Sequence, residues 1–151
     1  TISQAGMILA LNAVFQTIAT IFAGQLLSKL FLHKEKRLIL MATLIVAALL
    51  IAFVMSSNLY VSVVLLLLIN MISVTAFTAI FTWPHKIMDA GIIGSSIGII
   101  NTGGTLGGFL APMVIGFLVQ AAKGSFVPAF FFMAVMSLLC GMTVIAVKTK
   151  A

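Results

Sequence analysis

The sequence predicts an all-α integral membrane protein with five transmembrane helices, and three observations support this fold class. Hydrophobic residues make up 63% of the 151 residues and charged residues 7%, with a mean hydropathy of +1.34, whereas a soluble domain is about a quarter charged. Five apolar stretches have about the 20 residues that a helix needs to cross the hydrocarbon. Charged residues are concentrated in the gaps between them. We expect one transmembrane unit, residues 1–151, with helices over residues 3–29, 38–56, 60–82, 92–120 and 127–147.

The basic residues predict the orientation of the helices. If the five spans alternate in direction, seven of the eight lysines and arginines fall on one side of the membrane. Cytoplasmic loops carry such an excess, so we expect the N-terminus outside and the C-terminus in the cytoplasm. The side with one basic residue holds Lys123, and the other holds Lys29, Lys34, Lys36, Arg37, Lys86, Lys148 and Lys150. Because no basic face with interleaved aromatic residues is present, nucleic acid is not an expected partner.

Polar residues follow one side of the first predicted span. Asn12 and Gln16 are four residues apart, within a stripe of polar or small residues at four-residue steps, and therefore share a helix face. The third span carries Asn70 and Thr78. An amide inside a membrane is costly unless it bonds to another helix or lines a wet cavity. Either role could explain one of them, but the shared pattern favours a common polar cavity.

The second and last spans carry almost no polar residues beyond Thr43, Ser137, Thr143 and Cys140. We therefore expect these two helices to be a peripheral scaffold that faces lipid. Cys140 is the single cysteine and lies within an apolar stretch, so it is expected to serve as a small hydrophobic residue.

The fourth span is rich in glycine, and each glycine would cost a helix in water about 1 kcal/mol relative to alanine. In a membrane, small residues four apart allow two helices to approach closely. Asn101 and Thr105 lie among them, near the middle of the span, and are candidates to bind a substrate. The expected packing residues are Gly103, Gly104, Gly107, Gly108, Pro112 and Gly116.

The sequence contains few side chains that could catalyse a reaction or bind a metal. Glu35 and Asp89 are the only acids and fall at the membrane boundary or in a loop, where Asp89 can cap the fourth helix. His33 and His85 lie in basic gaps, where solvated side chains are expected. No carboxylate pair, metal-ligand cluster or nucleophile beside a base is present. We expect neither an enzyme nor a bound metal or cofactor.

Two segments resemble the major facilitator superfamily of transporters. Residues 24–29, Gly-Gln-Leu-Leu-Ser-Lys, followed by the basic loop to Arg37, resemble the glycine-led loop signature repeated in each half of these proteins. Ser28 or Lys29 stands in place of the usual aspartate. The region from Pro84 to Phe126 resembles the tenth to twelfth helices of the anion:cation symporter branch.

The resemblance implies that the five spans are helices eight to twelve of twelve. It implies a secondary active transporter of an organic anion, such as a sugar acid or other carboxylate, that works by alternating access, with a proton as one option for the coupling ion. The location would be the plasma membrane, here a bacterial inner membrane. The chain would be a fragment whose partner is the missing N-terminal half. A structural or channel-like subunit, with glycines that serve only helix packing, is the alternative. The substrate-cavity candidates are Asn101, Thr105, Asn12, Gln16, Asn70 and Thr78.

Overall fold

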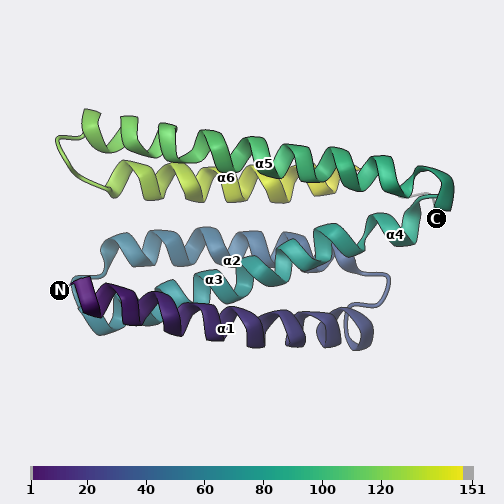
Figure 1. Cartoon of the computed structure of the whole chain (residues 1–151), viewed down its shortest axis with the longest axis horizontal. Helices are drawn as coiled ribbons and strands as arrows, with labels where there is room; N and C mark the ends of the chain where they lie inside the picture. The colour runs from purple at the N-terminus through teal and green to yellow at the C-terminus, as the bar shows by residue number, and fades with distance from the viewer. Residues whose placement is uncertain (1, 148–151) are drawn as a thin grey trace.

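The computed structural model describes residues 2–147, and helices are the regular secondary structure of this part of the chain (Figure 1). Five of its helices are long and apolar enough to cross a membrane, which confirms the predicted fold class. The helices are α1 (Ile2–Lys29), α2 (Glu35–Met55), α3 (Leu59–Thr82), α4 (Pro84–Ile87), α5 (Ala90–Ala121) and α6 (Val127–Ala146).

One long helix begins three residues earlier than expected, and one short helix was not expected. α2 begins at Glu35 rather than at Leu38, because the three charged residues before Leu38 form its first turn instead of a loop. The four-residue helix α4 is an addition between α3 and α5. Pro84 occupies its first position, where a missing amide hydrogen leaves no bond unmade.

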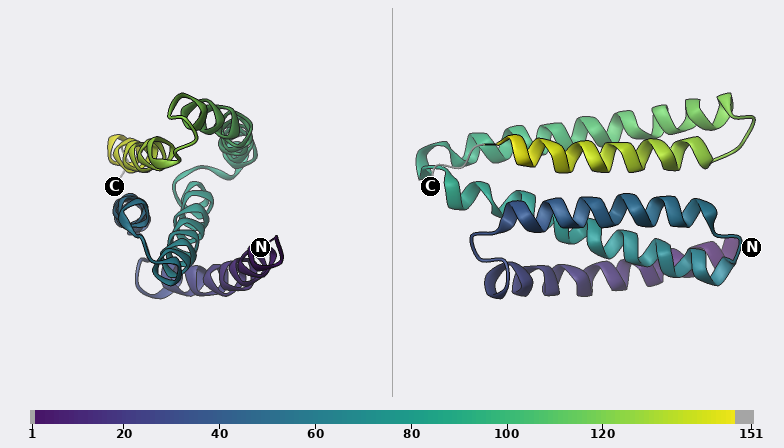
Figure 2. Two further views of the ribbon diagram at one scale, coloured as in Figure 1. Left: turned by 90° about the vertical axis from the view of Figure 1, so that its left-hand side faces the viewer. Right: turned by 180° about the vertical axis from the view of Figure 1, so that it is seen from behind.

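The long helices stand side by side in a curved row. α1 packs on α3, α3 on α2, α2 on α6, and α6 on α5. Viewed along the helices, the row is a crescent with α1 and α5 at its two ends (Figure 2). The short α4 contacts both α3 and α5 and so connects the middle of the crescent to one end.

Successive helices run in opposite directions, so the basic residues separate by end (Figure 1). The end of α1, the start of α2 and the helix α4 lie together and carry Lys29, the segment 34–37 and Lys86, whereas Lys123 follows α5 at the other end. This is the separation on which the predicted orientation depends. Lys148 and Lys150, which were counted with the first group, lie outside the described residues.

The hydrophobic core is centred on α2. Its buried residues Leu38 and Ile39 pack with Leu27 of α1 and Ala79 of α3 in one cluster. Farther along α2, a second cluster joins it to Ala134 of α6. The expectation that α2 is peripheral is therefore wrong. A helix that is apolar on every side is suited to a protein core as well as to lipid, and here α2 lies between α3 and α6.

A close contact of small residues joins α2 to α6. Gly141 is buried, and a methyl group at its position would lie 2.5 Å from Oγ1 of Thr43. The hydroxyl of Ser137 donates a hydrogen bond of 2.9 Å to the carbonyl oxygen of Thr43. The absence of a side chain at position 141 thus lets the two helices approach, as expected for small residues in membrane helices.

Charged residues tie α4 to the start of α2. Glu35 is 3% exposed and forms an ion pair with Lys86 of α4. Lys36 lies over the ring of Trp83, with its Nζ 5.5 Å from the ring centroid, and donates a hydrogen bond to the carbonyl oxygen of Val147. Of the two places expected for Glu35, the membrane boundary or a loop, the structure shows the first residue of a helix at the end of the bundle, with its charge buried against a lysine that is distant in sequence.

The expected cap of the glycine-rich helix is also different. Asp89 holds the residue position just before α5, but its side chain makes no capping hydrogen bond within the described chain. Its backbone carbonyl accepts a bond of 3.0 Å from the amide of Ile92 instead. The prediction of a carboxylate cap is wrong, although Asp89 does mark the start of the helix.

Candidate functional site

Two of the predicted site residues meet between α1 and α3. Nε2 of Gln16 donates a hydrogen bond of 3.1 Å to Oδ1 of Asn70. Nδ2 of Asn70 in turn donates to the backbone carbonyl of Leu66, at 2.8 Å. Each amide group has two hydrogens and an oxygen with two acceptor sites, so these bonds leave part of its hydrogen-bonding capacity unused among the described residues.

Asn12 lies one helical turn before Gln16 and shares its face of α1. Its Oδ1 atom is buried and has no hydrogen-bond partner among the described residues. A buried acceptor without a partner costs about 1–3 kcal/mol. Asn12, Gln16 and Asn70 form a group that we name the amide cluster.

The amide cluster lies at mid-membrane depth. Gln16 is thirteen residues before Lys29, the end of α1, and Asn70 is twelve residues before Thr82, the end of α3. At 1.5 Å per residue, these positions are about 20 Å and 18 Å from the same end of the bundle. The hydrocarbon core is about 30 Å thick, so both amides are far from either surface.

The two threonine candidates bond to their own helices. The hydroxyl of Thr78 donates to the carbonyl of Val74 at 2.8 Å, and that of Thr105 to the carbonyl of Asn101 at 2.9 Å. Each hydroxyl oxygen can still accept a bond. Thr78 is only four residues, or about 6 Å, from the end of α3. It therefore lies much nearer to the membrane surface than the amide cluster does.

The candidates on α5 are separate from the amide cluster. Asn101 and Thr105 are exposed, and α5 stands at the opposite end of the crescent from α1 (Figure 2). The glycines of this helix have no other part of the described chain within 4 Å of where a Cβ would lie. All six expected packing residues are exposed, namely Gly103, Gly104, Gly107, Gly108, Pro112 and Gly116.

The chemistry of these positions is limited to hydrogen bonding. The amide cluster offers amide hydrogens and carbonyl oxygens, and none of its members can gain or lose a proton. Within residues 2–147, no group of three histidine, cysteine, aspartate or glutamate side chains is placed to hold a metal ion. The arrangement suits the recognition of a polar solute within a membrane.

Comparison with known families identifies the class of protein. The family model described as the Major Facilitator Superfamily matches residues 1–150. The chain belongs to the major facilitator superfamily. Proteins of this superfamily are membrane transporters of small molecules and are in general not enzymes, in agreement with the five membrane spans. The searches of curated proteins and of solved structures found no match.

Two features of this superfamily member were missed in the sequence. Ser137 and Gly141 of α6 are four residues apart, the spacing of small residues in close helix contacts, so their spacing alone could have indicated the contact with α2. The ion pair of Glu35 and Lys86 had no such signal. Its partners are 51 residues apart, and each lies in a segment that resembles a solvated loop.

Proposed function

We propose that this major facilitator superfamily protein is a secondary active transporter of an organic anion, such as a sugar acid or another carboxylate. The observation that carries the proposal is the amide cluster at mid-membrane depth between α1 and α3. Transporters with alternating access hold their substrate near the bilayer midplane. Polar residues at that depth are expensive and usually functional.

The hydrogen-bonding pattern suits a hydroxylated carboxylate. The unpaired Oδ1 of Asn12 needs a donor, which a sugar hydroxyl provides. The amide hydrogens of Gln16 and Asn70 can move from their present partners to a carboxylate oxygen. The membrane-spanning part of α1 before Lys29 has no charged side chain, nor has α3. In this proposal, the cation that balances the substrate comes from an N-terminal half of the same protein.

That half also provides the partner of α5 in this proposal. The exposed stripe around Gly104 and Gly108 would face it and slide or tilt as the transporter opens to one side and then to the other. Asn101 and Thr105, on the same helix, would reach the substrate from the far side of the cavity. Gly104→Leu and Gly108→Leu should then abolish transport while membrane insertion continues. Normal turnover in both variants would refute the sliding surface.

The test is counterflow of a labelled sugar acid in proteoliposomes that contain the intact protein. Three variants remove hydrogen bonds to the substrate, namely Gln16→Ala, Asn70→Ala and Asn101→Ala. A loss of about 0.5–1.5 kcal/mol of binding free energy corresponds to a KM raised roughly 2–10-fold. Thr143→Ala is the matched control, because its exposed hydroxyl bonds to Cys140 on α6, away from the cluster. Unchanged affinity and rate in all three variants would exclude this site.

The same preparation tests the alternative and the coupling ion. A structural or channel-like subunit would give no saturable counterflow. If protons drive uptake, an inward proton gradient should accelerate it and a protonophore should remove the effect.

We place the protein in a bacterial inner membrane with Lys123 outside. A membrane-impermeant maleimide should accordingly label Lys123→Cys in intact cells and fail to label Lys34→Cys, and the reverse result would refute the orientation.

A further inference from the structure

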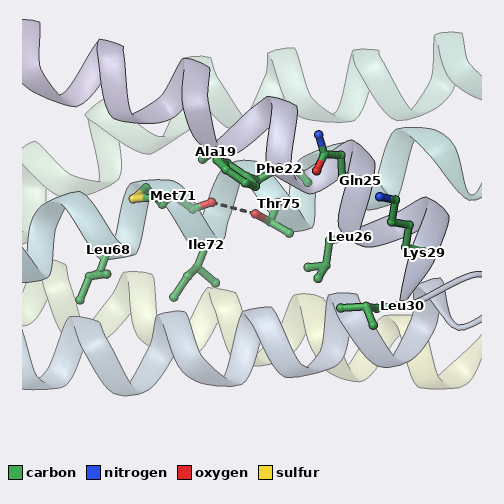
Figure 3. A pocket seen from close by; sticks show the side chains of 11 residues that line it. Ala19, Phe22, Gln25, Leu26, Lys29, Leu30, Leu68, Met71, Ile72 and Thr75 are labelled. Carbon is green, nitrogen blue, oxygen red and sulfur yellow. Dashed lines mark hydrogen bonds between the residues drawn. The ribbon is translucent and has the colours of Figure 1, made fainter.

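A groove runs between α1 and α3 on the surface of the bundle. Its volume is about 560 Å³. Phe22 and Leu68 are 62% and 40% exposed and form part of its open rim, so the groove is accessible from the side of the molecule. Its lining residues are Ala19, Phe22, Ala23, Gln25, Leu26, Lys29, Leu30, Leu68, Met71, Ile72 and Thr75 (Figure 3).

The groove has an apolar length and a polar end. Figure 3 shows Leu68 and Met71 toward one end, and Gln25 and Lys29 together at the other. Between them, the hydroxyl of Thr75 donates to the carbonyl of Met71 at 3.0 Å, so its hydrogen is not available to a ligand. Lys29 is the last residue of α1 and therefore lies where the helix leaves the membrane.

The positive charge at the polar end has no acidic partner among the described residues. The sequence has two acids, of which Glu35 is paired with Lys86 and Asp89 lies before α5. The connection that follows Lys29 adds Lys34, and the first turn of α2 adds Arg37; both residues are exposed. The charge near this end of the groove is thus strongly positive and would be balanced by an anionic group at the membrane surface.

We propose that the groove is a binding site for one anionic phospholipid, with an acyl chain along α1 and α3 and the phosphate on Lys29. An acyl chain fills apolar volume that would otherwise lack dispersion contacts. Basic pockets between transmembrane helices at the membrane surface bind anionic head groups. No residue of the amide cluster lines the groove, so the lipid assignment can be tested separately from the substrate assignment.

Native mass spectrometry of the intact protein tests the proposal with phosphatidylglycerol and phosphatidylcholine of identical acyl chains. The protein should retain phosphatidylglycerol in preference. Lys29→Gln should reduce that preference about fivefold, the effect expected for one basic side chain near an anionic surface. Lys123→Gln is the matched control, since it removes a lysine at the other end of the bundle. An unchanged preference in Lys29→Gln would overturn the head-group assignment.

A second variant tests the acyl-chain part of the site. Leu68→Trp should fill the groove and reduce the retention of both lipids, while Leu110→Trp, at an exposed position of α5 outside the groove, should not. Equal retention in both variants would overturn the proposal. A spin label on Leu68→Cys, in a Cys140→Ser background, should show the high oxygen accessibility of a lipid-facing site. Low accessibility would mean that another protein helix covers the groove, and would also overturn it.

Discussion

Replacement of Asn12 by leucine should make the protein more stable and a poorer transporter. The carbonyl oxygen of Asn12 is buried and has no partner in the described chain. An unsatisfied acceptor of this kind costs about 1–3 kcal/mol, and leucine has nearly the same size without the polar atoms. Asn12→Leu should therefore raise the free energy of unfolding by about 1–3 kcal/mol. Loss of one substrate hydrogen bond should raise the KM roughly 2–10-fold.

Unfolding in mixed micelles can be followed by the fluorescence of Trp83, the single tryptophan. Asn58→Leu is the matched control, because Oδ1 of Asn58 accepts bonds from the amides of Tyr60 and Val61 at the start of α3. That variant should lose about 1 kcal/mol of stability. If Asn12→Leu is also destabilised, the oxygen has a partner and the reasoning fails. If it is stabilised but transports normally, Asn12 does not contact the substrate.

Three further predictions concern contacts between helices. In a double-mutant cycle, Gln16→Leu and Asn70→Leu should show a coupling of about 0.6 kcal/mol, the average for hydrogen bonds between membrane helices; additive effects would mean that the bond contributes nothing. Gly141→Ala should lower the free energy of unfolding by about 1–3 kcal/mol, because the added methyl group overpacks against α2. Gly104→Ala should leave the stability of the described bundle unchanged. Equal effects would refute the inference that α6 is closely packed at its glycine and α5 is not. Lys86→Met should lower the free energy of unfolding by about 3 kcal/mol, because it leaves the buried carboxylate of Glu35 without its lysine. If the variant unfolds at the same denaturant concentration as the wild type, the ion pair contributes no stability.

Hydropathy was sufficient to predict the long helices, because an apolar segment that crosses a membrane must satisfy its own backbone hydrogen bonds. Each spanning segment must satisfy its own amide groups, and a helix does so within the segment. The sequence could not reveal the neighbours of each helix. α2 is apolar on every side, which suits lipid and protein equally, and only the structure shows Ile39 and Leu50 in the core.

The candidate site could be predicted from the sequence only in part. The four-residue spacing of Asn12 and Gln16 correctly indicated a shared helix face, and Asn70 does meet that face. The same reasoning grouped Asn101 with them because it is an amide at a similar depth. Depth along a helix does not determine which way a helix faces or where it stands in a bundle, and α5 stands at the other end of the crescent.

The exposure of α5 has a consequence for the tolerance of this sequence to mutation. In the described part of the chain, none of its 32 residues is buried. Folding of this bundle therefore places few demands on α5, while α2, with a run of buried side chains, is constrained at nearly every turn. A saturation mutagenesis that scores protein abundance and uptake separately should find the two helices in opposite classes. Substitutions in α2 should deplete the protein from the membrane, and those along the glycines of α5 should leave it there, inactive.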